Sequence, residues 1–142
     1  MSALFLSHHP PEQYDRCIRV GRHYVCRRCA VLYPLALVVA IASLLGAHWP
    51  ATWDRTFLFL LPLPVTLEFV IERFGAVRYN PRRQILLTVL AAPAFGRGFA
   101  RYAAHPTDRL FWTMVLLFGG SALLSLLLSR GAGGDPANKA RH

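Results

Sequence analysis

The sequence predicts an all-α membrane protein in which four transmembrane helices follow a small cysteine-rich cap in the cytoplasm. Of the 142 residues, 54% are hydrophobic and 16% are charged, and mean hydropathy is +0.35. Soluble domains carry about a quarter charged residues. The apolar residues gather into four runs near the roughly 20 residues that a helix needs to cross about 30 Å of hydrocarbon. We therefore expect a cap over residues 1–29, a membrane domain over 30–129 and a disordered tail over 130–142.

The first apolar run, residues 30–49, reads "AVLYPLALVVAIASLLGAHW". Pro34 falls in its opening turn, where a missing N–H costs little. His48 and Trp49 close the run with amphipathic side chains that favour a membrane interface. These features predict the first span.

The second run, residues 56–74, contains Pro62 and Pro64. Each proline removes a helical hydrogen bond, so we expect a kink or local unwinding. Membrane helices tolerate such breaks when neighbouring groups satisfy the freed carbonyls. We expect this run to form the second span.

The third run, residues 84–103, is the most polar of the four and carries Arg97 and Arg101. Arg97 lies about 20 Å along a helix from Arg83, which places it nearer the outer face than Glu68. We therefore expect no pair between Glu68 and Arg97. Both arginines of this run are expected to snorkel to the outer headgroups.

The fourth run, residues 110–128, is uninterrupted, and "RGAGGDPANKARH" after it is Gly-rich and polar, as disordered tails are. Small side chains let helix backbones approach closely in lipid. Two sets of small residues therefore predict helix contacts: Ala92, Gly96 and Ala100 in the third run, and Gly119, Gly120 and Ser121 in the fourth.

The positions of the basic residues predict orientation, because cytoplasmic loops are rich in Lys and Arg. Three segments would face the cytoplasm, with Arg16, Arg19, Arg22, Arg27, Arg28, Arg73, Arg78, Arg82, Arg83, Arg130, Lys139 and Arg141. The opposite side has Arg55, Arg97, Arg101 and Arg109. Both termini are thus expected in the cytoplasm, in the inner (cytoplasmic) cell membrane. Topology accounts for the net charge of +9, so a nucleic-acid partner is not expected.

The stretch "CIRVGRHYVCRRC" concentrates the reactive side chains of the chain. Cys26 and Cys29 form a C-x-x-C, and the residues before it alternate apolar and polar around Gly21, as a short hairpin does. Such a hairpin brings Cys17 back toward Cys26 and Cys29. Disulfides are disfavoured in the cytoplasm, which favours metal or redox roles for these thiols.

The preferred interpretation is a zinc or other soft-metal site formed by Cys17, Cys26, Cys29 and one histidine. Zinc favours four tetrahedral Cys and His ligands, and a C-x-x-C supplies two from one turn. His9 has the longest reach as the fourth ligand, His8 is its neighbour, and His23 is close enough to Cys26 to have difficulty bending in. The hypothesis is a small multi-pass membrane protein with a cytoplasmic metal site.

Two other functions stay open beside the metal site. A C-x-x-C at a helix start, beside arginines, has its thiolate stabilised by the helix dipole and by the positive charge. That pattern suits a membrane thiol oxidoreductase using Cys26 and Cys29. The third hypothesis is an accessory or assembly subunit of a larger membrane complex, or a homo-oligomer, with small-residue helix faces as contacts. The cysteines could also be buried thiols without a further role.

Polar residues near the cytoplasmic side predict a second feature. Glu68 and Glu72 are one helical turn apart and share a face of the second run. The pocket expected there consists of Glu68, Arg28, Arg78, Asn80 and Arg83 together with the cysteine cap. A salt bridge that makes Glu68 tolerable is the simpler interpretation, and Asn80-Pro81 is a turn signal that starts the third helix.

The segment "SHHPPEQYDRCIRVGRHYVCRRCAVLYP" resembles the head of a family of small bacterial and archaeal membrane proteins of unknown function. Its signature is a His-Pro element, then Cys-x-Arg-Cys, then a Tyr leading into the first span. The pattern falls on His8, His9, Pro10, Cys26, Arg28, Cys29 and Tyr33. The family usually has Gly soon after the second Cys, and Cys17 is not a fixed part of its pattern. Without Cys17, the resemblance implies a set of two cysteines and two histidines. It implies architecture and site location, with Tyr33 beside the polar pocket, and no activity.

Overall fold

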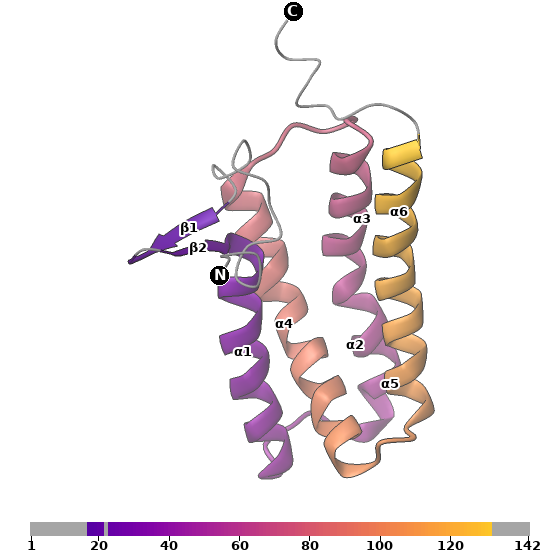
Figure 1. Cartoon of the computed structure of the whole chain (residues 1–142). Helices are drawn as coiled ribbons and strands as arrows, with labels where there is room; N and C mark the ends of the chain where they lie inside the picture. The colour runs from indigo at the N-terminus through magenta and orange to yellow at the C-terminus, as the bar shows by residue number, and fades with distance from the viewer. Residues whose placement is uncertain (1–16, 22, 132–142) are drawn as a thin grey trace, which may run out of the picture.

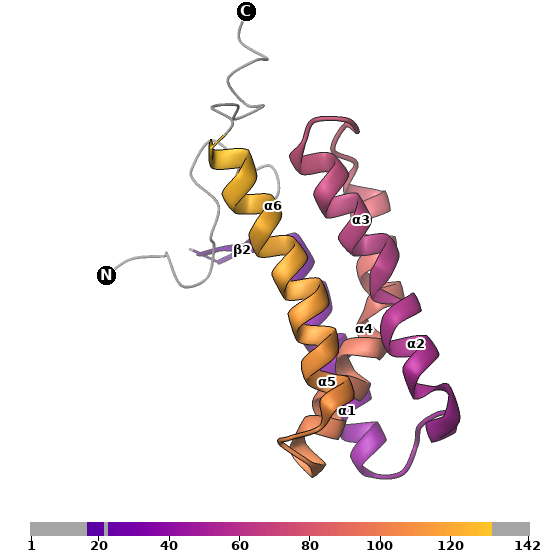
Figure 2. The same cartoon turned by 90° about the vertical axis from the view of Figure 1, so that its right-hand side faces the viewer.

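The computed structural model describes residues 17–21 and 23–131, which form a hairpin and a mostly helical bundle (Figure 1). The strands are β1 (Cys17–Val20) and β2 (His23–Cys26). The helical elements are α1 (Arg27–Leu44), the 3₁₀ turn η3 (Ala51–Trp53), α2 (Asp54–Leu60), α3 (Pro62–Arg73), α4 (Pro81–Ala104), α5 (Arg109–Met114), the π-helical η4 (Val115–Gly119) and α6 (Gly120–Gly131). Figure 2 shows α2 and α3 end to end, and likewise α5 and α6.

The hairpin agrees with the alternating pattern in the sequence. Strand β1 pairs antiparallel with β2, with Cys17 opposite Cys26 and Val20 opposite His23. Gly21 lies in the turn at φ 62°, a conformation that glycine adopts without strain. The prediction of a short hairpin that returns Cys17 to Cys26 is confirmed.

Two helical segments within residues 17–21 and 23–131 are long and apolar enough to cross a membrane: Arg27–Leu44 and Arg109–Leu128. The prediction of four such spans is not supported. The run over 56–74 is divided at Leu61, because Pro62 starts a new helix. Helix α4 has 24 residues, but its arginines make it too polar to meet the same test.

Helix bounds differ from the sequence expectation at both ends of the predicted membrane domain. Helix α1 begins at Arg27 and ends at Leu44, whereas the predicted span was 30–49. Cys29 therefore belongs to the first turn of a helix and not to the cap. At the other end, α6 continues to Gly131, and the remainder of the expected tail lies outside the described residues.

Helix α1 packs on α4 along a line of small residues, as the stripe in the third run predicted. A Cβ added at Gly96 would lie 2.5 Å from the carbonyl oxygen of Ala36 and 2.6 Å from Cβ of Val39. Ala92 and Ala100 are buried above and below it on α4. Only glycine fits this close contact between the two backbones.

The glycines of the fourth run have different surroundings. Added Cβ atoms at Gly119 and Gly120 would meet nothing within 4 Å among the described residues. Within residues 17–21 and 23–131, Gly119 and Gly120 therefore form no close backbone contact of the kind seen at Gly96. The apolar core lies elsewhere, where Leu58 of α2 meets Phe111, Met114 and Phe118.

Candidate functional site

The three cysteines lie where the hairpin joins α1, as two neighbouring pairs that share Cys26. Cys17 and Cys26 face each other across the two strands and are 7% and 4% exposed. Cys29, one turn into α1, interacts with the side chains of both Cys26 and Tyr33. The structure places none of these three thiols in a disulfide. The local pairing of β1 with β2 and the early start of α1 produce this thiol cluster (Cys17, Cys26 and Cys29).

Histidines do not complete the thiol cluster in the part of the chain that the structure describes. Among residues 17–21 and 23–131, no three His, Cys, Asp or Glu side chains are arranged to hold a metal ion. His23 is exposed at the turn end of the hairpin, opposite Val20 and away from Cys26. His8 and His9, the other predicted ligands, lie outside the described residues.

A cluster of ion pairs lies beside the thiols and joins α1, α3 and α4. Nη2 of Arg28 donates to Glu68 at 3.2 Å and to Glu72 at 3.3 Å. Nε of Arg83 donates to the other oxygen of Glu68 at 2.7 Å. We call these four residues the hairpin-end cluster. Because both carboxylates face arginines, the salt-bridge interpretation of Glu68 accounts for the contacts seen.

The remaining residues of the predicted polar pocket have separate roles. Arg78 contributes its carbonyl oxygen, which accepts a hydrogen bond of 3.0 Å from Nη2 of Arg83. The side chain of Asn80 accepts from the backbone N–H groups of Arg82 and Arg83, so it caps α4. Tyr33 is half-exposed on α1, next to Cys29 and not among the ion pairs.

The opposite end of the bundle holds a network that sequence reasoning missed. Asp54, at the start of α2, accepts two hydrogen bonds of 3.0 Å from Nε and Nη2 of Arg97. It also accepts from Arg101 at 2.6 Å and from the indole of Trp49 at 2.8 Å. Asp54 is 1% exposed. Arg97 is buried in this contact, so the expectation that it snorkels to headgroups is wrong.

Asp108 extends the network to the loop before α5. It accepts two hydrogen bonds from Arg101, at 3.2 and 2.6 Å, and one from the backbone N–H of Phe111 at 2.8 Å. We call Trp49, Asp54, Arg97, Arg101 and Asp108 the Asp54 network. Arg101 therefore bridges two carboxylates, and the prediction that it reaches outward to headgroups is wrong as well.

Electrostatics favour the charged form of Asp108. Hydrogen bonds from Arg101 hold the pKa of Asp108 below its ordinary value. Asp54 lies within ion-pair distance of both Arg97 and Arg101. The two carboxylates thus balance the charge of the two arginines.

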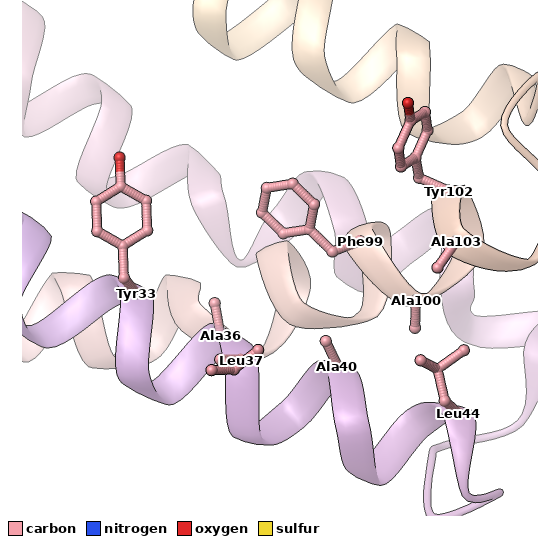
Figure 3. A pocket seen from close by; sticks show the side chains of 9 residues that line it. All are labelled: Tyr33, Ala36, Leu37, Ala40, Leu44, Phe99, Ala100, Tyr102 and Ala103. Atoms are coloured by element: carbon pink, nitrogen blue, oxygen red, sulfur yellow. The ribbon is translucent and has the colours of Figure 1, made fainter.

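Two hollows flank the contact between α1 and α4. An apolar groove of about 470 Å³ runs along both helices, and Figure 3 shows the rings of Tyr33, Phe99 and Tyr102 along it. A polar pocket of about 290 Å³ lies at the Asp54 network and is lined by Arg97, Arg101 and His105 among others. The sequence did not predict either hollow.

Comparisons with protein families, characterised proteins and solved structures gave no match to this chain. The resemblance to the small membrane-protein family stays a prediction. The site is therefore interpreted from its own geometry.

Proposed function

We propose that this protein is a small multi-pass membrane protein whose hairpin presents a soft-metal site, with zinc as the preferred ion, at the cytoplasmic membrane surface. The observation that supports it is the thiol cluster. Cys17 lies opposite Cys26 in the hairpin and Cys26 interacts with Cys29 of α1, and thiolates are the ligands that zinc prefers. The fourth ligand would be His9 or His8, which precede β1 in the chain.

The membrane placement draws on the two apolar helices and on the surface of the bundle. Segments Arg27–Leu44 and Arg109–Leu128 meet the length and apolarity that a span requires. Large apolar side chains, such as Leu37, Leu116 and Leu124, are more than half exposed. In the proposed arrangement α2–α3 and α4 also lie within the bilayer, their charges satisfied by the two ion-pair groups, and both termini are cytoplasmic.

Metal analysis of the protein purified in detergent tests the site. About one zinc per chain is expected in the wild type, and the Cys26→Ser/Cys29→Ser variant should lose it. His23→Ala is the matched control, because His23 lies at the far end of the hairpin and should not affect metal content. His9→Ala and His8→Ala then identify the fourth ligand. A metal-free wild-type protein, prepared without chelators, would refute the proposal.

A second function, thiol oxidoreductase, is favoured by the direct interaction between Cys26 and Cys29. Two thiols so placed can form a disulfide, releasing two electrons and two protons to an acceptor such as a membrane quinone, which becomes the quinol. The same purified protein distinguishes the two functions. A metal-free chain with a reversible Cys26–Cys29 disulfide, seen as a loss of two alkylatable thiols after oxidation, supports the redox function instead.

A further inference from the structure

The apolar groove between α1 and α4 has the dimensions of one lipid tail. Its walls include Tyr33, Leu37 and Leu44 of α1 and Phe99 and Tyr102 of α4 (Figure 3). Tyr33 and Leu44 are eleven positions apart, which is about 16 Å along a helix. The hydrocarbon of a bilayer is about 30 Å thick, so the groove matches the depth of one leaflet.

The groove begins at the end of α1, where the polar pocket adjoins it. Leu44, the last residue of α1, lines both hollows, as does Ala100 of α4. The pocket adds Ser43, Arg97, Arg101 and His105. An apolar channel one leaflet deep therefore ends at a group of hydrogen-bond donors, which is the distribution of polarity along a phospholipid.

Arg97 provides a donor that the described part of the chain leaves unused. Its side chain is nine-tenths buried and lines the pocket. Asp54 occupies its Nε and Nη2, while Nη1 donates to no group in residues 17–21 and 23–131. Guanidinium groups bind phosphate oxygens strongly. Asp54 and Asp108 already balance the two arginines, so a phosphate would be held by directed hydrogen bonds with support from His105 and not by a large positive field.

We propose that the groove and the pocket together bind a single phospholipid. Its acyl chain lies between α1 and α4, and its phosphate accepts from Arg97 and His105. This inference rests on the membrane placement proposed above and is independent of the metal site.

Native mass spectrometry of the protein in detergent, titrated with phosphatidylglycerol, tests whether the groove binds the acyl chain of a phospholipid. Wild type should retain one lipid. Leu37→Trp narrows the groove and should lower lipid affinity at least tenfold. The matched control is Leu116→Trp, the same change at another exposed leucine that does not line the groove, and it should leave affinity unchanged. Equal loss in the two variants would show ordinary boundary lipid and overturn the proposal.

The headgroup is tested at Ala104, an exposed residue that lines the polar pocket. Ala104→Glu places a carboxylate beside the phosphate and should weaken binding at least tenfold, whereas Ala104→Gln, of the same size, should not. Identical affinities for both variants would overturn the phosphate position. The zinc content of each variant is measured in parallel, so a failed metal site is recognised separately from a failed lipid site.

Discussion

The two ends of the bundle both bury carboxylates among arginines, but they hold them differently. In the Asp54 network a single carboxylate is almost fully enclosed and binds Arg97 through two parallel hydrogen bonds. In the hairpin-end cluster the side chain of Arg83 is 37% exposed, and Glu68 receives single hydrogen bonds from two arginines. We therefore expect the two ends to contribute unequally to stability, because water competes for Arg83 more than for Arg97.

Asp54→Asn should have the largest effect. It leaves the buried guanidinium of Arg97 without its counter-charge, and removing one partner of a buried pair costs about 3–5 kcal/mol. The loss of stability is measured by thermal unfolding in detergent, with the fluorescence of Trp49, Trp53 and Trp112 as the readout. Two of these indoles bond within this end of the bundle, Trp49 to Asp54 and Trp112 to the carbonyl of Pro106. The double variant Asp54→Leu/Arg97→Leu should recover much of the loss, and no recovery would contradict the role given to the pair.

Acidification should destabilise the end of the bundle that holds the Asp54 network. The pKa of Asp108 is lowered in the folded protein, so the contribution of Asp108 to stability is complete above the ordinary carboxyl range. It is lost as pH falls through the lowered value. The melting temperature of the wild type, followed by tryptophan fluorescence, should drop over that acidic range. The drop should be smaller in Asp108→Asn, and an equal drop in that variant would argue against the assignment.

Glu68→Gln should have an intermediate effect at the hairpin-end cluster. The change removes the charge that faces Arg28 and Arg83 while keeping the shape of the side chain. Loss of a buried, charge-assisted hydrogen bond costs about 1–3 kcal/mol. Circular dichroism during thermal unfolding measures this loss in the free energy of unfolding. A cost equal to that of Asp54→Asn would remove the proposed difference between the two ends.

Arg83→Met should have the smallest effect. Arg83 keeps contact with water, and exposed ion pairs contribute about 0–1 kcal/mol. Methionine retains the apolar stem, so packing on α4 changes little. The same unfolding assay applies, with Arg83→Lys as the control that keeps the charge. A loss above that of Glu68→Gln would mean that Arg83, and not Arg28, is the main partner of Glu68.

Sequence reasoning succeeded where the deciding interactions are local. The hairpin follows from alternation around Gly21, and the cap of α4 follows from Asn80-Pro81. The close contact at Gly96 was also predictable, since small residues four apart lie on one helix face. Each of these patterns is complete within a short segment of the chain.

The Asp54 network could not be predicted from a local sequence pattern. Asp54 and Arg97 are 43 positions apart and belong to helices whose neighbours only the fold decides. A signal was present, because Asp54 and Asp108 both fall on the side of the membrane predicted for Arg97 and Arg101. Because Arg97 and Arg101 were interpreted as anchors in the headgroups, their pairing with Asp54 and Asp108 was not predicted. The start of α1 was missed as well: Arg27 and Arg28 were placed in the cap, whereas they begin α1, where Arg27 bonds to Tyr79 before α4 and Arg28 bonds to Glu68 of α3.

The division at Leu61 has a mechanical consequence. Pro62 and Pro64 lack an N–H, so the carbonyls of Leu58 and Leu60 lose their usual helical donors at the joint between α2 and α3. Asp54 stands on one side of this joint and Glu68 on the other. We therefore expect α3 to tilt relative to α2 at this joint more easily than a continuous helix would bend, while Asp54 keeps its bonds to Arg97 and Arg101.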